Sequence, residues 1–320
     1  MLCKKIFERV IMTLCIVSIM VFVVGCDNET AANSKAAEKS LPAANSSSAA
    51  KKIQEGLNLF NSLDYKGAIN LLDEISALKL KTIAEYNLRG EYFVKVGEYH
   101  FDTKDYDKGQ KLFDLAIQDY SSAIKLNPKD IESYLNRGNF YCTHGDQDLA
   151  IDDYNKVIEL DPNNVDAYIG RGNAYNHTGH LAQRDLHTAV QLNPNDFKAY
   201  MARSVIYLSV GQSSLALDDA NKAVELNPEE SEVYNNRGNI YLELKQYDSA
   251  LQDYDKAIEL DPKNYKAYKG RGVVYSARRE YDRAMEELEK CIKIYPELNA
   301  VNLLNHCYYL SLKEKNGNSD

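Results

Sequence analysis

The chain has 320 residues and a formal net charge of −9, from 47 acidic and 38 basic side chains. An acidic protein repels the phosphate backbone of nucleic acids, so this charge argues against a nucleic-acid partner. Hydrophobic residues make up 44% of the chain, which is enough for a sizeable core and excludes a chain that is disordered throughout.

Residues 1–25 have the pattern of a cleaved export signal peptide. Lys4, Lys5 and Arg9 make a basic start, and an uncharged run follows over residues 10–24. As a helix this run would rise only about 22 Å, which is less than a hydrocarbon core of roughly 30 Å. A run of this length suits the apolar region of a signal peptide better than a membrane span.

The apolar run ends in Val23-Val24-Gly25-Cys26, which resembles the lipobox of bacterial lipoproteins. In that family the cysteine receives lipid, such as palmitate, and becomes the new N-terminus after cleavage. Val24 stands where alanine or serine is commoner, so a plain secretory signal or an uncleaved anchor stays open. The resemblance implies lipidation of Cys26 and a protein anchored on the periplasmic or extracytoplasmic face of a cell membrane.

Residues 26–48 comprise this cysteine and a predicted flexible tether. The segment is mostly Ala, Ser, Asn and Lys, with a single proline at Pro42. Such a composition cannot bury enough apolar surface to offset the entropy lost on ordering. A flexible coil of about 24 residues spans roughly 25–30 Å, so the tether would hold a folded domain off a membrane.

A repeat of about 34 residues organises the rest of the chain. Six prolines are separated by 34, 32, 34, 34 and 34 residues: Pro128, Pro162, Pro194, Pro228, Pro262 and Pro296. Each closes a phrase such as Ile258-Glu259-Leu260-Asp261-Pro262, downstream of a phrase such as Arg237-Gly238-Asn239-Ile240-Tyr241. Since proline cannot continue a helix, the pattern predicts helix pairs that recur along the chain.

This pattern resembles the tetratricopeptide repeat family, whose repeats are stacked helix hairpins. Numbered 1 to 34, that repeat has bulky residues near positions 4, 11 and 24, small residues at 8, 20 and 27, and proline at 32. Here position 4 is tyrosine in six repeats, position 8 is glycine in six, and position 20 is alanine in six. We expect the glycine at 8 to face the alanine at 20 and so let the two helices approach.

The resemblance predicts an all-α fold, an α-solenoid of about seven repeats with a C-terminal capping helix. The predicted repeats are residues 49–82, 83–130, 131–164, 165–196, 197–230, 231–264 and 265–298. Residues 299–313 predict the capping helix, because a terminal repeat buries its core only if something covers it. Residues 314–320 are predicted to form a disordered tail.

The second repeat is fourteen residues longer than the others. Its second-helix pattern occurs twice, once in Gly109, Phe113 and Ala116 and again in Ala116, Tyr120 and Ala123. Seven residues make nearly two helical turns, so both registers keep one apolar face. We therefore expect each helix of this hairpin to be longer by about seven residues.

A paired charge pattern recurs in repeats two to seven, with arginine at position 7 and an acidic residue at position 23. The first repeat has Glu55 and Leu71 there and lacks both. This joint occurrence predicts an arginine–carboxylate bridge between the two helices of a repeat, with a charged ligand track as the alternative. The predicted pairs are Arg89–Asp119, Arg137–Asp153, Arg171–Asp185, Arg203–Asp219, Arg237–Asp253 and Arg271–Glu287.

Enzyme signatures are absent from the sequence, which has no GxSxG, P-loop or HExxH motif. We therefore expect no catalytic residue, no metal and no cofactor, and a protein that is not an enzyme. The stretch Asp105-x-Asp107-x-Gly109 imitates only part of a calcium loop. Four histidines could hold a transition metal only if they converged, which their predicted helix and turn positions disfavour: His144, His177, His180 and His187.

Three cysteines remain after the signal and the lipidation site: Cys142, Cys291 and Cys307. They lack the CxxC spacing of zinc sites, and an odd number gives no disulfide framework. Small buried apolar side chains are the simplest interpretation. A disulfide between Cys291 and Cys307 stays open.

The family resemblance implies a ligand site on the concave face of the solenoid, lined by first helices at positions 2, 5, 9, 12 and 13. These positions hold Asn139, Cys142, Asn173, Asn176, His177, Met201, Leu208, Asn235, Asn239, Leu242, Lys266 and Lys269. Amide side chains can bond a peptide backbone with little demand on its sequence.

We therefore expect a membrane-anchored scaffold or adaptor that binds proteins or extended peptides in the bacterial cell envelope. Capture of a glycan or a metal by an envelope lipoprotein is the alternative. The partner, the oligomeric state and the membrane that holds the protein stay open.

Overall fold

The computed structural model describes residues 47–62, 64–175, 179–294 and 298–317. Within these residues all regular structure is α-helical, which confirms the predicted fold class. The signal peptide, Cys26 and the tether up to residue 46 lie outside the described residues. The contacts divide the chain into two compact units, residues 1–185 and 186–320, and each is described by itself.

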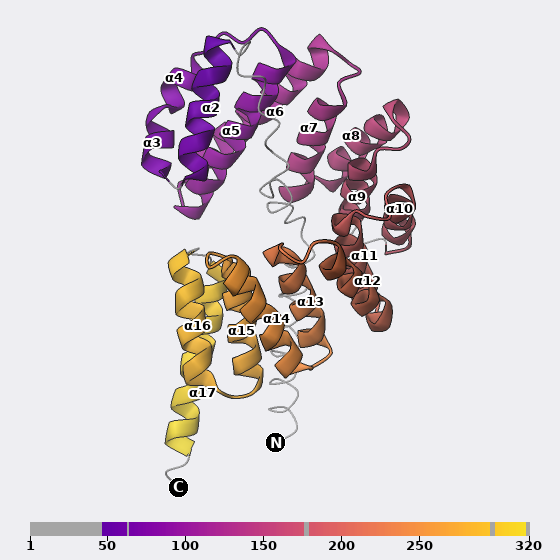
Figure 1. Ribbon diagram of the computed structural model, residues 1–320. Helices are drawn as coiled ribbons and strands as arrows, with labels where there is room; N and C mark the ends of the chain where they lie inside the picture. The colour runs from indigo at the N-terminus through magenta and orange to yellow at the C-terminus, as the bar shows by residue number, and fades with distance from the viewer. Residues whose placement is uncertain (1–46, 63, 176–178, 295–297, 318–320) are drawn as a thin grey trace. The chain divides into compact units, whose positions relative to one another are not determined.

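The first unit is a series of helix hairpins (Figure 1). From α5 to α9 each helix contacts the next one along the chain, and contacts also join α2 to α5, α5 to α7, and α7 to α9. First helices of neighbouring hairpins therefore lie against one another. The helices are α2 (Ser48–Asn61), α3 (Tyr65–Asn70), α4 (Leu72–Ser76), α5 (Ile83–Asp102), α6 (Tyr106–Leu126), α7 (Ile131–Thr143), α8 (Gln147–Leu160), α9 (Val165–Ala174) and the start of α10 (Gly179–Leu192).

The second unit repeats this arrangement, with contacts from α11 to α13 and from α13 to α15. Its core lies where Tyr254 of α14 packs with Ala267 and Val274 of α15. After the end of α10, its helices are α11 (Phe197–Ser209), α12 (Ser213–Leu226), α13 (Ser231–Glu243), α14 (Tyr247–Leu260), α15 (Tyr265–Ala277), α16 (Tyr281–Ile294) and α17 (Leu298–Gly317).

Short polar side chains stabilise the turns that contain the regularly spaced prolines. The carboxylate of Asp161 accepts a hydrogen bond from the backbone N–H of Asn163 at 3.1 Å, across Pro162. Asn164 then caps α9, because its side-chain oxygen accepts from the Ala167 N–H at 3.0 Å. One helix is thus stopped and the next begun within four residues, which keeps the repeat length nearly constant.

The long second hairpin is lengthened equally in both helices. Helices α5 and α6 have 20 and 21 residues, against 13 and 14 in α7 and α8, as the doubled sequence pattern predicts. The added turns bury aromatic side chains of their own. Phe101 stacks on Phe113 with 5.0 Å between ring centroids, and Tyr99 lies 5.0 Å from Tyr65 of the first hairpin.

The second helix of the first repeat is interrupted at Leu71, between α3 and α4. The buried Tyr92 donates a hydrogen bond from its hydroxyl to the carbonyl of Ala68 at 2.6 Å. The Leu71 N–H bonds the same carbonyl at 3.1 Å, in a tighter pattern than an α-helix. The Ala68 carbonyl therefore accepts from both the Tyr92 hydroxyl and the Leu71 N–H, at the point where the helix is interrupted.

Tyrosines at position 24 occupy the space that the glycines leave. Tyr154 is fully buried, and it packs against Gly138 of its own repeat and Gly170 of the next. Tyr254 lies in the same way against Gly238 and Gly270. The position-8 glycines of these two repeats thus face a ring from position 24, whereas Gly272 of the last repeat also lies against the carbonyl of Ala284 at position 20, as expected.

The end of the chain differs from its prediction. The capping helix continues through Lys313, Glu314 and Lys315 to Gly317, where a disordered tail is predicted from residue 314. Lysine and glutamate favour helix, so the helix runs on until glycine. Residues 318–320 lie outside the described residues.

Gly170→Ala should lower the stability of the first unit by about 1–3 kcal/mol, because overpacking a filled core forces side chains to shift. An added Cβ would lie 2.5 Å from Cε1 of Tyr154. Gly138→Ala is the control, since its Cβ would lie 3.1 Å from the same ring and alanine favours helix by about 0.5–1 kcal/mol. Urea midpoints from circular dichroism measure both, and equal midpoints would contradict the ring-filling role of Tyr154.

Candidate functional site: the arginine ladder and the first-helix face

The predicted arginine–carboxylate bridges are present in repeats two to seven. In the third repeat, Nε of Arg137 donates to Oδ2 of Asp153 at 2.9 Å and Nη2 donates to Oδ1 at 2.7 Å. Four further pairs are bidentate in the same way: Arg89–Asp119, Arg171–Asp185, Arg203–Asp219 and Arg237–Asp253. The aspartates are buried, so each bridge joins two helices inside the protein.

The last bridge is weaker. Nη2 of Arg271 lies 3.2 Å from Oε1 of Glu287, while Nε of Arg271 and Oε2 of Glu287 are buried without a hydrogen-bond partner. The glutamate also pairs with Lys290 at 2.7 Å. Its extra methylene group and its second partner account for the loss of the two-bond geometry that the aspartates show.

The remaining guanidinium nitrogen, Nη1, reaches the preceding repeat. Nη1 of Arg137 donates to Oγ of Ser121 at 2.8 Å, and Nη1 of Arg171 donates to Oδ1 of Asn155 at 2.6 Å. The acceptors lie sixteen residues before each arginine, at position 25: Ser121, Asn155, His187, Asn221 and Asp255. We call these arginines and their partners at positions 23 and 25 the arginine ladder. The sequence pattern predicts the partner at position 23 but not the one at position 25, although a polar residue recurs there in these repeats.

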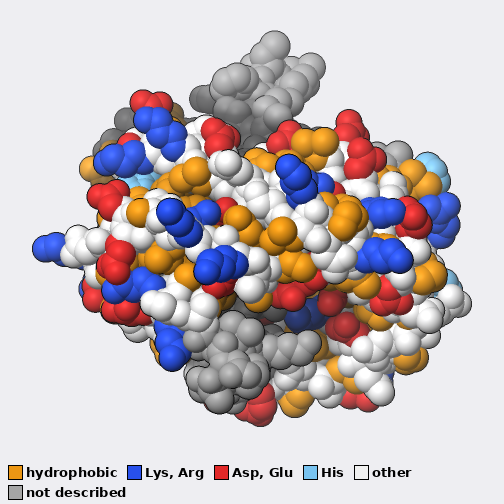
Figure 2. Space-filling model, turned by 90° about the horizontal axis from the view of Figure 1, so that it is seen from above, with side chains coloured by type: hydrophobic (Ala, Val, Ile, Leu, Met, Phe, Trp, Pro, Cys, Tyr) orange, Lys and Arg blue, Asp and Glu red, His pale blue; other side chains and the backbone are white. Residues whose placement is uncertain are grey.

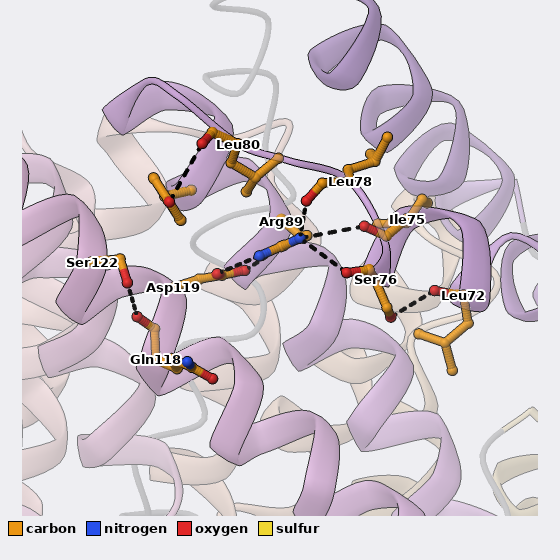
Figure 3. Close-up of polar contacts among 10 residues, drawn as sticks. Leu72, Ile75, Ser76, Leu78, Leu80, Arg89, Gln118, Asp119 and Ser122 are labelled. Carbon is orange, nitrogen blue, oxygen red and sulfur yellow. Dashed lines mark hydrogen bonds and ion pairs between the residues drawn. The ribbon is translucent and has the colours of Figure 1, made fainter.

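Arg89 replaces this contact with backbone carbonyls (Figure 3). Its Nη1 lies 3.5, 3.3 and 3.0 Å from the carbonyl oxygens of Ile75, Ser76 and Leu78. Helix α4 ends at Ser76, so its last carbonyls lack partners within the helix and accept from the arginine. The ladder thus also secures the first hairpin, which has no arginine of its own.

The pKa shifts of the ladder residues arise from contacts within the protein. The hydrogen bond to Asp153 raises the pKa of Arg137, and burial raises the pKa of Asp119 against the opposing effect of Arg89. The guanidinium of Arg137 also lies 5.9 Å from the ring centroid of Tyr134. Because its donors are used within the protein, the interpretation as a ligand track loses support.

The first-helix face, which we define as positions 2, 5, 9, 12 and 13 of the first helices, holds the residues predicted to bind a ligand. Asn139 of α7 is exposed, and its Oδ1 accepts a hydrogen bond from the hydroxyl of Tyr154 at 2.7 Å. Asn239 of α13 accepts from Tyr254 at 2.7 Å. These amides are therefore also structural acceptors, which the sequence analysis did not foresee.

Other predicted residues of this face are not free to bind a ligand. Cys142 is buried with Tyr154 and Ala174 and is disulfide-bonded, so the expectation that it is only a small apolar side chain is wrong. Leu208 and Leu242 pack partly buried against the core of the second unit. Half-buried positions are Asn173, Met201, Lys266 and Lys269. Asn176 and His177 lie outside the described residues.

Two buried amides at position 5 lack complete hydrogen bonding. Asn235, which the sequence analysis places on this face, is 5% exposed and its Oδ1 has no partner. Asn87 of α5 is also 5% exposed, and neither its Oδ1 nor its Nδ2 has a partner. The predicted set omits Asn87 and its neighbour Glu91, although positions 5 and 9 of the second repeat would have identified both.

The candidate metal ligands do not converge. Among the described residues, no three histidine, cysteine or acidic side chains form a group that could hold a metal ion. The His144 ring stacks on Phe140 with 4.2 Å between centroids, and His187 contacts Gln191 and Arg203. Asp105, from the partial calcium motif, pairs with Lys108 at 2.8 Å.

Cys291 and Cys307 are buried thiols that do not form a disulfide in the structure. Burial raises the pKa of the Cys307 thiol, against a hydrogen bond with Ser276. These features fit the packing role that the sequence suggests for them.

The face of the molecule seen in Figure 2 carries side chains of mixed type. In the view of Figure 2, basic, acidic and hydrophobic side chains are interspersed. Within the part of the chain that the structure describes, no helix is both long enough and apolar enough to cross a bilayer.

Family models match the chain in its repeats. Three models described as tetratricopeptide repeat match residues 197–230, 231–264 and 253–286, and a model described as TPR repeat matches residues 105–145 and 138–179. Together they cover residues 105–179 and 197–286, about half of the chain. The matches to 197–230 and 231–264 coincide with two of the repeats predicted from the prolines.

Solved structures share the fold at low sequence identity. A tetratricopeptide repeat protein from Parabacteroides merdae has 19% identity and a TM-score of 0.58, over 81% of this chain and 98% of that one. Yeast Tom70 has 17% identity and a TM-score of 0.58, over 84% and 65%. The APC/C hetero-tetramer Cut9–Hcn1 has 18% identity and a TM-score of 0.56, over 81% of this chain and 48% of that one. No curated protein matches the chain.

Asp153→Asn should lower stability by about 2–3 kcal/mol, since it leaves the largely buried guanidinium of Arg137 without a counter-charge. Asn155→Ala, on the same helix, should cost only about 0.5–1.5 kcal/mol, because it removes a neutral acceptor between repeats. Urea unfolding of the two variants tests this order. A larger loss in Asn155→Ala would show that contacts between repeats, not within them, dominate the ladder.

Proposed function

The chain belongs to the tetratricopeptide repeat family, and on this basis we propose that it is a non-enzymatic scaffold or adaptor that binds proteins or extended peptides. The first-helix face is the proposed binding surface. The observation that carries the proposal is the pair of asparagines whose amide oxygens are held by buried tyrosines, Asn139 in the first unit and Asn239 in the second.

A held amide oxygen orients the rest of the amide group. With Oδ1 bonded to Tyr154, the Nδ2 donors of Asn139 have a fixed direction and can meet a peptide carbonyl. Because the side chain is ordered before binding, less conformational entropy is lost when a ligand arrives. Backbone recognition of this kind suits an adaptor, since it gives affinity without a strict sequence requirement.

The proposed location is the bacterial cell envelope, with Cys26 lipidated and the folded repeats on the periplasmic or extracytoplasmic side of the membrane. The support is the sequence alone: a basic start, a short apolar run, the Val23–Cys26 motif and a polar segment after it. In this proposal the lipid holds the protein at the membrane, and the segment after Cys26 lets the repeats reach partners nearby.

Cys26→Ser should abolish incorporation of an alkyne-labelled palmitate analogue by the protein in a bacterial host, since serine lacks the thiol that accepts the lipid. The control is Cys15→Ser, which alters a cysteine that leaves with the signal peptide and should keep full labelling. Gel fluorescence after click chemistry measures both. Labelling that persists in Cys26→Ser would disprove lipidation at this residue.

The double variant Asn139→Asp and Asn239→Asp should weaken partner binding about tenfold while keeping the thermal midpoint. Aspartate still accepts the tyrosine hydrogen bonds but lacks amide donors and repels peptide carbonyls. Quantitative cross-linking with mass spectrometry in the native host measures the partners.

The matched control is Gln118→Glu with Gln252→Glu, which adds the same charges to exposed positions of the second helices α6 and α14. Partners retained equally by both double variants would place binding away from the first-helix face. Absence of any cross-linked protein, even with the wild type, would contradict an adaptor role and favour capture of a small ligand.

A further inference from the structure

Asn87 is a buried polar side chain that the fold does not explain. It is 5% exposed, and both polar atoms of its amide lack hydrogen-bond partners. Position 5 carries an apolar residue in the other hairpins of the first unit: Ile53, Leu135 and Ile169. Since an apolar residue suits this position and an unpaired buried amide costs stability, its presence points to a ligand that completes its hydrogen bonds.

An acidic side chain lies beside Asn87 on the same face of α5. At 100° per residue, Glu91 lies one turn further along the helix and within about 40° of Asn87 around its axis. Lys95 is nearby, at about 80°, and is basic. Helix α7 contacts α5 and contributes the exposed Glu132 from its first turn.

Electrostatic effects place Glu132 near Glu91. Burial raises the pKa of Glu91, the charge of Lys95 opposes this effect, and the charge of Glu132 adds to it. Two carboxylates against one ammonium group leave the site negative.

We propose that this acidic site, formed by Asn87, Glu91 and Glu132, binds the side chain of a lysine or arginine in an extended peptide partner. The proposal rests on the function proposed above and specifies the partner's chemistry. Glu91 and Glu132 accept charge-assisted hydrogen bonds from the cation, and Oδ1 of Asn87 provides a further acceptor. Nδ2 of Asn87 donates to a carbonyl of the peptide backbone.

A basic side chain fits better than a metal ion. Among the described residues, no three acidic, histidine or cysteine side chains are arranged to hold a metal. A lysine or arginine can bond to carboxylates that do not converge on a point, because its donors point in several directions on a long stem. Asn139 is on α7 as well, so the peptide that brings the cation can also meet its amide.

The test passes a random mixture of N-acetylated, C-amidated hexapeptides over immobilised full-length protein in detergent and identifies the retained peptides by mass spectrometry. The wild type should enrich lysine and arginine about tenfold over the input, as expected for a charge-assisted hydrogen bond. Glu91→Gln with Glu132→Gln should abolish that enrichment but still retain neutral peptides. Asp148→Asn with Asp152→Asn, two exposed positions of α8, removes equal charge and should change nothing.

The outcomes separate the acidic site from the proposed function. Peptides retained by the wild type without enrichment of basic residues would overturn the acidic site and leave peptide binding standing. Enrichment that survives Glu91→Gln with Glu132→Gln would also overturn it. Retention of no peptide at all would contradict peptide binding itself.

Asn87→Leu tests whether the amide serves binding or folding. The variant should retain about tenfold less basic peptide, while its thermal midpoint stays equal or rises, because leucine occupies the same position at Leu135. A lower midpoint would mean that the fold needs the amide, and would overturn its assignment to the ligand.

Discussion

The constraint on which the rest of the structure depends is the need to satisfy an arginine buried between two helices. In repeats two to six the ladder arginine has planar donors that match an aspartate on the second helix of its own repeat, and a further donor that reaches the repeat before it, as Arg137 shows. Removing a charge from water is costly, so such a pair persists only where geometry is good and all donors are used. The ladder therefore fixes the spacing within a hairpin and the register between hairpins at once. In Arg89 the same demand is met by the free carbonyls at the end of α4.

The tyrosines at position 24 connect this framework to the proposed binding surface. The ring of Tyr154 fills the gap between Gly138 and Gly170, and its hydroxyl emerges beside Asn139 on the first helix. Core packing thereby orients a surface amide, and the same arrangement recurs at Tyr254 and Asn239. A change to such an asparagine affects folding as well as binding, unless the replacement keeps an oxygen acceptor. Asn173, whose repeat lacks a tyrosine at position 24, has no equivalent support in the structure.

Departures from the repeat carry the functional information, because positions that the fold dictates are the same in most hairpins. Within the first unit Asn87 departs from the apolar residues at position 5, and Glu91 departs from the amides that Asn139 and Asn173 place at position 9. Both fall in the hairpin with the two lengthened helices. A repeat that differs in length, in charge and in hydrogen bonding is the natural place for a specific contact, whereas the regular repeats supply rigidity and generic backbone recognition.

Sequence alone determined the helix pairs, the equal lengthening of α5 and α6, and the partners of the arginines at position 23. These follow from local periodicity, from proline chemistry and from residues that appear and disappear together. Only the tertiary structure decided what fills the space beside the glycines, which side chain at position 25 receives each arginine, and that Asn87 has no partner. Those outcomes depend on side chains that come from different helices and meet only in the folded protein. A repeat pattern shows which residues recur but not where their side chains meet.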